Sequence, residues 1–163
     1  MTDQDGFAAR VLSRAAPIFR RDAVRPVTRL LTNLHAALYR LTGGRAQVRA
    51  HPTALLTVTG RRTGKPWTVP VVYITDGDRY VIAAAYAGSD RDPTWWLNLQ
   101  AHPEADFQVG RHPMRVTAQL ASPAERGALW RRLVQMYPPF ASYQRSTTRE
   151  IPVIVLRPVP PDR

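Results

Sequence analysis

The sequence has no cysteine among its 163 residues. Disulfides, thiol nucleophiles and cysteine-ligated metal sites are therefore excluded. Apolar runs approaching the roughly 20 residues that cross a bilayer are also missing. Four arginines interrupt the first 21 residues, so no signal-peptide apolar core is expected there. From these absences we expect a soluble protein in the cytoplasm.

Acidic residues are scarce, with 12 Asp and Glu against 23 Lys and Arg, and the formal net charge is +11. Lysine occurs once, as Lys65, and the other cations are arginines. Residues 1–50 hold nine Arg and three Asp and therefore contribute +6 of this charge. Such a charge attracts an acidic ligand, nucleic acid or an anionic membrane surface. The arginine bias is also typical of a GC-rich genome.

The segment from 7 to 42 has helical spacing, with prolines at 17 and 26 that divide it. We expect residues 1–50 to form an arginine-rich helical segment and residues 51–163 a separate barrel domain. Such a helix either covers the open end of a barrel or lies on a membrane surface. The apolar stripe of its second part comprises Val27, Leu30, Leu31, Leu34, Leu38 and Leu41.

From residue 54 onward the sequence changes to short runs of β-branched and aromatic residues bounded by Gly, Pro and Asp. Asp76-Gly77 between two of these runs is typical of a tight hairpin. The runs predict six strands with antiparallel hairpins and flanking helices, which together form a small α+β barrel. The expected strands are Ala54–Thr59, Thr68–Thr75, Arg79–Tyr86, Glu104–Val109, Met114–Ala121 and Ile151–Leu156.

Two helices are expected between the strands. Asp92 resembles a helix N-cap followed by Pro93 in the first turn, which predicts a short helix through Trp95, Trp96 and Leu99. A capping-box pattern, in which Ser122 precedes Glu125 by three residues, predicts a second helix. We find no internal repeat and no linker that would require another domain within the barrel.

The loop Gly60-Arg61-Arg62-Thr63-Gly64-Lys65 places three cations and a hydroxyl between glycines. Glycines let a backbone approach a ligand closely, and exposed amides in such a turn form an anion-binding nest. Arginine adds paired donors that match phosphate oxygens. The loop therefore predicts a phosphate site, and the alternative is a solvated hairpin loop. It is not a P-loop, because the glycine spacing differs and no helix follows.

Aromatic residues form the other candidate features. Tyr137, Phe140 and Tyr143 recur every three residues, and such a row is usually explained by core packing. Pro138-Pro139 argues against a regular buried helix there and favours a wall of rings around a flat ligand.

Conventional catalytic sets are missing from the sequence. The histidines at 35, 51, 102 and 112 lack metal-ligand spacing, so no metal is expected. No serine lies in a nucleophile-elbow context. A phosphate site and aromatic walls without acid–base residues indicate a protein in which a cofactor carries the chemistry.

Three runs of the sequence resemble the deazaflavin-dependent nitroreductases, also described as F420H2-dependent quinone reductases. The resemblance covers residues 52–158 and rests on the TGRxTGxP, WxLNLxAxP and MYPxxxxYQ pieces taken together. It implies a split β-barrel that binds coenzyme F420 and transfers a hydride to a quinone, an enone or a nitroaromatic. The matching runs are LLTVTGRRTGKPWTVPVVYITDGDRYVIAAA, DRDPTWWLNLQAHPEADFQVG and MYPPFASYQRSTTREIPVIVLRP.

The resemblance also implies roles for individual residues. The glycine-rich loop would hold the phosphate of the cofactor tail, and Arg91 would be another contact with the acidic tail. Trp95 would lie beside cofactor and acceptor, while Tyr137 and Tyr143 would line the acceptor pocket. Trp95, Tyr137 and Tyr143 are therefore the candidate catalytic residues. The candidate cofactor-binding residues are Arg61, Arg62, Thr63, Gly64, Lys65, Pro70, Ala84, Arg91 and Trp95.

The chain departs from the family pattern at three places. Phe140 replaces a tyrosine of the nitroimidazole-reducing member, which makes reduction of that class of compound doubtful. Trp67 replaces an arginine, and Tyr86-Ala87 lies near the position of a Ser-Lys pair.

Two alternative functions remain open at the level of sequence. One keeps the barrel but binds FMN or FAD through the same basic loop. The other is a non-catalytic basic protein that binds a membrane or nucleic acid. For the preferred function we expect a small-molecule acceptor, no specific nucleic acid, and a monomer or homodimer. Some family members associate with membranes through the N-terminal segment, so residues 7–42 could hold this chain at the inner face of the cell membrane.

Overall fold

The computed structural model describes residues 51–160. The N-terminal segment predicted to be helical, 7–42, lies outside the described residues, and so does residue 50, where we placed the domain boundary. Among the helices of the described residues, none combines the length and the apolar character that a membrane crossing requires.

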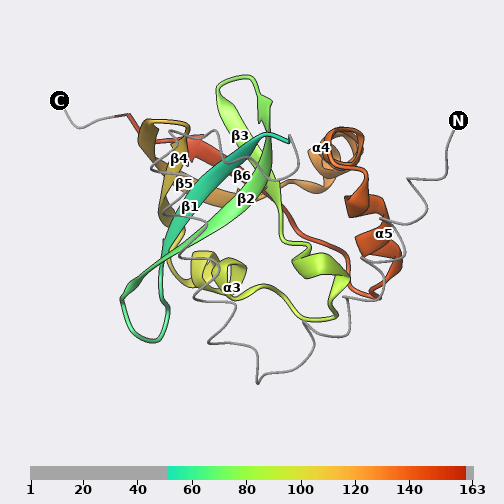
Figure 1. The fold of residues 1–163 in the computed structure, drawn as a ribbon, viewed down its shortest axis with the longest axis horizontal. Coiled ribbons are helices and arrows are strands. Elements are labelled where there is room, and N and C mark those ends of the chain that lie inside the picture. The colour runs from blue at the N-terminus through green and yellow to red at the C-terminus, as the bar shows by residue number, and fades with distance from the viewer. Residues whose placement is uncertain (1–50, 161–163) are drawn as a thin grey trace, which may run out of the picture. The chain divides into compact units, whose positions relative to one another are not determined.

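The described residues form a closed barrel of six strands in the order β1-β2-β3-β6-β5-β4 (Figure 1). Every neighbouring pair is antiparallel, and the pairing of β1 with β4 closes the ring. This arrangement confirms the predicted antiparallel barrel with flanking helices. The strands are β1 (Thr53–Thr59), β2 (Pro66–Asp76), β3 (Arg79–Ala83), β4 (Glu104–Val109), β5 (His112–Leu120) and β6 (Val153–Pro158).

Two tight turns confirm the hairpin expected at Asp76-Gly77 and the one between β4 and β5. Gly77 and Gly110 both have a positive φ, of 63° and 60°, which glycine adopts without steric cost. The register follows from these turns, with Asp76 opposite Arg79 and Val109 opposite His112. The chain therefore reverses over two residues at both places.

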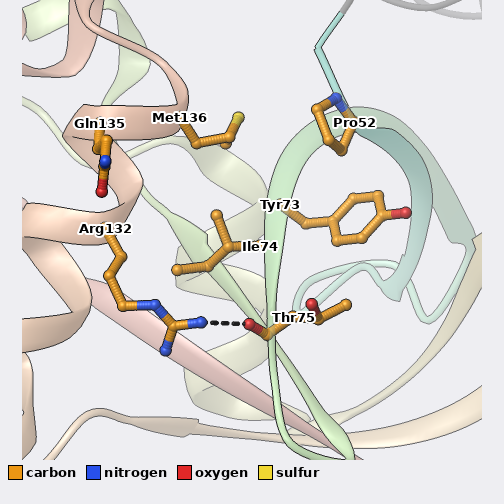
Figure 2. Close-up of a pocket in the computed structure, with 7 residues that line it drawn as sticks. All are labelled: Pro52, Tyr73, Ile74, Thr75, Arg132, Gln135 and Met136. Atoms are coloured by element: carbon orange, nitrogen blue, oxygen red, sulfur yellow. Dashed lines mark hydrogen bonds between the residues drawn. The ribbon is translucent and has the colours of Figure 1, made fainter.

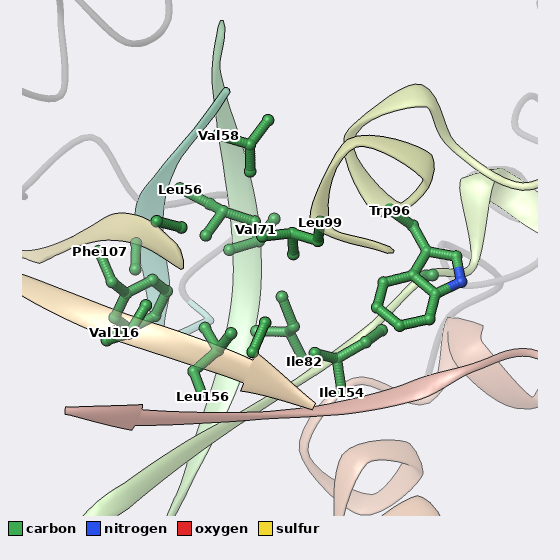
Figure 3. Packing of buried hydrophobic residues seen from close by; sticks show 14 residues of the cluster. Leu56, Val58, Val71, Ile82, Trp96, Leu99, Phe107, Val116, Ile154 and Leu156 are labelled. Atoms are coloured by element: carbon green, nitrogen blue, oxygen red, sulfur yellow. The ribbon is translucent and has the colours of Figure 1, made fainter. Parts of the chain in front are cut away.

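The barrel interior is filled by alternate residues of the strands, and Figure 3 shows this core with Phe107 and Leu156 among its members. Ile82 faces the interior, whereas its neighbour Val81 belongs to a second cluster outside the barrel. The same alternation places Ile154 inside and Val155 outside. Strands β3 and β6 are thus buried on both faces, which explains their nearly continuous apolar sequence.

Within residues 51–160, three α-helices and one 3₁₀ helix flank the barrel. Helix α4 packs its buried Leu129 and Leu133 against the outer faces of β3 and β6, and α5 packs against η3. Helix α3 instead adds Trp96 and Leu99 to the interior core. The bounds are η3 (Tyr86–Gly88), α3 (Thr94–Ala101), α4 (Pro123–Met136) and α5 (Pro139–Arg145).

The capping box expected for the second helix is present. The amide of Ser122 donates a hydrogen bond of 3.0 Å to the carboxylate of Glu125, and Pro123 occupies the first turn. Arg79 also donates to Glu125, at 2.9 Å. These hydrogen bonds hold the pKa of Glu125 below its usual value, the amide of Ser122 being the main cause. The start of α4 is therefore tied to the β2–β3 hairpin.

Three local predictions are wrong. The third strand ends at Ala83 rather than Tyr86, because Ala85 has helical backbone angles and Tyr86 and Ala87 then adopt left-handed φ values of 46° and 51°. Pro93, not Asp92, is the N-cap of α3. Asp92 instead accepts a hydrogen bond from a distant arginine, a partner that no local pattern reveals.

The third error concerns Pro138-Pro139, which we expected to disfavour a regular helix. Pro139 begins α5, and proline suits the first turn of a helix because the missing amide has no partner there anyway. Strand limits elsewhere differ from the predicted ones by no more than two residues.

Candidate functional site

The glycine-rich loop between β1 and β2 is a compact turn. The carbonyl of Gly60 accepts from the amides of Thr63 at 3.1 Å and Gly64 at 2.7 Å, while the Gly60 amide donates to Lys65 at 2.9 Å. A Cβ at position 60 would lie 2.9 Å from the Thr63 hydroxyl oxygen and 3.0 Å from the Lys65 carbonyl oxygen. Gly64 has a φ of +65°. Both glycines are therefore required by the shape of the turn.

A buried asparagine anchors this loop to α3. Asn98 is 4% exposed, and its Oδ1 accepts from the Arg61 amide at 3.2 Å and from Arg61 Nη1 at 3.1 Å. Its own position is fixed because Asn98 lies on α3 beside the core residue Leu99. The motif that contains Asn98 was part of the family resemblance, but no pattern in the sequence indicated a role for this residue.

The cations of the loop lie at the surface. Residues 61–65 are all exposed, and within residues 51–160 neither Arg62 nor Lys65 has a salt bridge. Arg62 also has no hydrogen-bonded acceptor for its amide within that range. With two cations and one amide that have no partner among residues 51–160, and with the tethered Arg61, the loop is a suitable receptor for an anion such as a phosphate.

The connection from β3 to α3, residues 84–93, contains two further candidate cofactor-binding residues. Ala84 is fully buried in the barrel core, whereas Arg91 is exposed. Gly88 has a φ of +76°, and a Cβ there would lie 2.9 Å from the carbonyl oxygen of Tyr143. The connection therefore lies directly against α5, as the contacts between η3 and α5 also indicate.

Arg149 holds this connection in place from the segment between α5 and β6. Its guanidinium donates to the carbonyls of Ser89, Ala84 and Ala85 and to the carboxylate of Asp92, over distances of 2.9 to 3.1 Å. The side chain of Arg149 is only 16% exposed. Sequence reasoning missed this residue, because its partners lie 57 to 65 positions earlier in the chain.

The aromatic row forms one packed group. Phe140 is buried, and its ring centroid lies 5.0 Å from that of Tyr137 and 6.3 Å from that of Tyr143. Tyr137 also packs edge-on against His51, with 5.0 Å between centroids. Both tyrosines are partly buried. Core packing therefore explains Phe140, while the tyrosines lie at the border of the core.

Trp95 and Pro70 lie elsewhere on the barrel. Trp95 is partly buried and packs against the interior core, as does Trp67. Pro70, on β2, pairs with Leu55 and is partly buried. Since Trp95 and Asn98 share α3, the glycine-rich loop and the tryptophan are positioned by one helix. The β3–α3 connection in turn joins that helix to the aromatic group.

A pocket of about 500 Å³ opens elsewhere, between β2 and α4 (Figure 2). Arg132 lies at its edge and donates to the Thr75 carbonyl at 2.6 Å and to the Asp76 carboxylate. Hydrogen bonds from Arg79 and Arg132 hold the pKa of Asp76 below its usual value. No predicted site residue lines this pocket; its lining comprises Pro52, Tyr73, Ile74, Thr75, Arg132, Gln135 and Met136.

Within residues 51–160 no group of three or more His, Asp or Glu side chains is arranged to hold a metal ion.

Comparison with known proteins identifies relatives over most of the chain. Residues 31–158 match the family of the F420H(2)-dependent quinone reductases. The F420H(2)-dependent quinone reductase Rv1261c of Mycobacterium tuberculosis is 39% identical over 132 residues, which cover 77% of this chain and 89% of that protein.

Solved structures agree with this match. An F420-H2 dependent reductase (FDR-A) aligns with a TM-score of 0.61 and 34% identity, over 65% of this chain and 94% of that one. A structure described as a domain-swapped dimer aligns with a TM-score of 0.63 and 28% identity, over 80% of this chain and 98% of that one. The fold and the resemblance predicted from sequence are both confirmed.

Proposed function

Because the chain belongs to the family of the F420H(2)-dependent quinone reductases, we propose that its glycine-rich loop, its β3–α3 connection, Tyr137 at the end of α4 and Tyr143 on α5 form the site for reduced F420 and a quinone acceptor. The protein is an F420-dependent oxidoreductase. The observation that carries the assignment of the site is the glycine-rich loop, whose unpaired cations and free Arg62 amide suit an acidic ligand.

The donor groups of this chain fit the chemistry of F420, whose tail carries a phosphodiester and glutamates. Arg62, Thr63 and Lys65 would hold the phosphate, and the Arg62 amide would add a backbone donor. Arg61 would act both as an anion ligand and as the anchor to Asn98. Arg91 would contact the outer, acidic part of the tail. Pro70, Ala84 and Trp95 would border the ring system.

Reduced F420, when bound, supplies a two-electron hydride from its deazaflavin ring. The chain's own contribution is then to hold the acceptor flat beside that ring and to exclude water from the contact. Tyr137 and Tyr143 would donate hydrogen bonds from their hydroxyls to an acceptor oxygen, and the buried Phe140 fixes the rings of both. Orientation alone can contribute about 7–11 kcal/mol to a barrier, so no strong acid or base is required.

A titration followed by tryptophan fluorescence tests the cofactor site. F420 and FMN are added separately to the purified protein, and Arg61→Ala and Arg111→Ala are titrated alongside. We expect tight F420 binding with little FMN response, weakened in Arg61→Ala only, because Arg111 lies in the β4–β5 turn. A preference for FMN would overturn the cofactor assignment, and equal effects of both variants would overturn the role of the loop.

The range of acceptors is a finer part of the proposal. A quinone fits the aromatic group, and enones and nitroaromatics share its flat, electrophilic character. Phe140 supplies no hydroxyl to a nitro group, so we expect quinones to be reduced much faster than nitroimidazoles. Oxidation of reduced F420 by menadione and by a nitroimidazole, compared at equal concentrations, measures this preference.

Location and assembly complete the proposal. We propose that the protein works in the cytoplasm, with residues 1–50 forming a segment distinct from the barrel. Its arginine-rich part, 7–42, would bind the inner face of the membrane, where lipid quinones are found. Co-sedimentation with anionic vesicles, with and without residues 1–50, tests this association. The similarity to a structure described as a domain-swapped dimer supports a homodimer. Light scattering would distinguish a homodimer from a monomer.

A further inference from the structure

Arg149 makes more hydrogen bonds to other segments than any other described side chain. Nε donates to the Ser89 carbonyl at 2.9 Å, and Nη1 donates to the Asp92 carboxylate at 2.9 Å. Nη2 donates to the carbonyls of Ala84 at 2.9 Å and Ala85 at 3.1 Å. All three nitrogens of the guanidinium therefore bind one connection, which runs from the end of β3 to the start of α3.

We propose that Arg149 is a positioning residue for hydride transfer, which fixes the β3–α3 connection against the segment between α5 and β6. This inference rests on the proposed function, because it concerns the distance between the cofactor side and the acceptor side of that same site. The guanidinium of Arg149 binds three backbone carbonyls and the Asp92 carboxylate. It acts through the backbone that it holds.

The connection needs such a partner because its backbone is irregular. Tyr86 and Ala87 both have left-handed φ values, a conformation that costs free energy for residues other than glycine and persists only where the surroundings enforce it. The β-ladder has ended at Ala83, so the following carbonyls are not paired by strand neighbours. A planar guanidinium with five donors can bind several carbonyls at once, whereas a lysine ammonium cannot span them.

The geometry joins two groups of proposed site residues. Ala84 and Arg91 belong to the connection, and Trp95 lies on the helix that follows Asp92. Tyr143 lies on the other side, on α5, where its carbonyl oxygen contacts Gly88. The hydroxyl of Thr147 adds a hydrogen bond of 2.9 Å to the Asp90 carboxylate.

Loss of these bonds leaves the barrel ladders intact but frees the connection. Since a misplacement of about 1 Å can cost roughly 100-fold in rate, we expect kcat to fall by about 10- to 100-fold in Arg149→Lys. The KM for the quinone changes less, because Tyr137 and Tyr143 remain packed against Phe140. Hydrogen exchange of residues 84–92 becomes faster in the same variant, even without cofactor.

Arg126 offers a matched control. It also binds the segment before β6, donating to the Ile151 carbonyl at 3.0 Å and pairing with Glu150 at 3.1 Å. Its contacts lie on the α4 side and include no atom of the β3–α3 connection. Arg126→Lys therefore removes comparable bonds from the same segment without touching the proposed site.

The experiment compares the wild type, Arg149→Lys, Asp92→Asn and Arg126→Lys in three measurements. These are the melting temperature, hydrogen exchange of the apo protein, and kcat and KM for menadione at saturating reduced F420. We expect faster exchange at 84–92 and a lower kcat in Arg149→Lys and Asp92→Asn but not in Arg126→Lys. This difference should hold even if all three variants have a lower melting temperature. Asp92→Asn removes only the ion pair with Arg149 and provides the same test if Arg149→Lys does not fold.

Unchanged exchange at 84–92 in Arg149→Lys would overturn the inference, and so would a kcat that falls equally in Arg126→Lys. If the wild type binds no F420, the proposed function fails and the role of Arg149 in hydride transfer fails with it. If the wild type binds and oxidises reduced F420 but Arg149→Lys retains full kcat, only the positioning role fails.

Discussion

The side-chain oxygen of Asn98 binds both the backbone amide and the guanidinium of Arg61, which lies 37 positions earlier in the chain. One buried atom on α3 thus fixes both the path of the glycine-rich loop and the direction of its first arginine. Because Asn98 is 4% exposed, water cannot easily replace it as a partner. The shape of the loop consequently depends on the packing of a helix that belongs to the barrel core.

We predict that Asn98→Ala weakens both folding and cofactor binding. The Arg61 amide loses its acceptor in a part-buried hydrogen bond, which costs about 0.5–1.5 kcal/mol of unfolding free energy. Urea denaturation measures this loss, and an F420 titration measures the accompanying rise in Kd. Asn98→Asp keeps an oxygen at the same place and should retain the Arg61 contacts. A Kd that rises equally in both variants would contradict the anchoring role of the oxygen.

Arg61→Ala should weaken F420 binding mainly through lost charge. A hydrogen bond to a charged group contributes about 1.5–3 kcal/mol, so we expect Kd to rise by roughly 10- to 100-fold. Exposed charges are screened by salt, so the wild-type Kd should rise with ionic strength and that of Arg61→Ala less steeply. Titrations at low and high NaCl check this, with Arg111→Ala as control. Parallel salt dependences in the wild type and Arg61→Ala would show that Arg61 does not contact the anion.

Tyr143→Phe should change acceptor kinetics more than cofactor affinity. A lost neutral hydrogen bond contributes about 0.5–1.5 kcal/mol, which corresponds to roughly a 2- to 10-fold drop in kcat/KM for a quinone. The F420 Kd should stay the same, because the ring and its packing against Phe140 are retained. Stopped-flow oxidation of reduced F420 measures the first quantity and fluorescence titration the second. An F420 Kd that rises as much as kcat/KM falls would place Tyr143 in the cofactor site instead.

Acid should weaken the β2–β3 hairpin through Asp76. Hydrogen bonds from Arg79, and secondarily from Arg132, lower the pKa of Asp76 in the folded state. The stabilisation is therefore complete above the unfolded pKa of about 3.9 and is lost as the pH falls through the lower folded value. We predict that Asp76→Asn lowers the melting temperature at pH 7 and that the difference narrows towards pH 3.

Asp78→Asn is the matched control for this prediction, since Asp78 is exposed in the same hairpin and forms no salt bridge within residues 51–160. Its melting temperature should stay close to that of the wild type at both pH values. A difference between Asp76→Asn and the wild type that persists unchanged at pH 3 would exclude the ionised carboxylate as its source.

Much of the barrel could be predicted because its signals are local. The alternation around Ile82 and Val155 and the glycine at 77 lie within a few residues of the structures that they specify. The capping box around Glu125 is local in the same way. The order of strands around the ring was not predicted, since no periodicity in the sequence indicates that β6 lies between β3 and β5.

The contacts that shape the site were not predictable in the same way. Asn98 and Arg149 act on backbone atoms that are distant in sequence, and a backbone carbonyl has no sequence signature. The error at Asp92 has the same origin. Its carboxylate fits a local capping pattern, but the ion pair with Arg149 across 57 positions determines where it lies.

The position of β6 has a consequence for synthesis of the protein. Strand β6 is the last strand along the chain, yet it lies between β3 and β5 and hydrogen-bonds to both. A nascent chain that has emerged only to residue 150 therefore exposes two unpaired strand edges, which are templates for aggregation. It also lacks three of the nine buried residues of the outer core under α4, namely Ile151, Val153 and Val155. A ribosome that stalls late, or a premature stop codon as far downstream as residue 152, should therefore yield an open, aggregation-prone sheet. It should not yield a slightly shortened but active reductase.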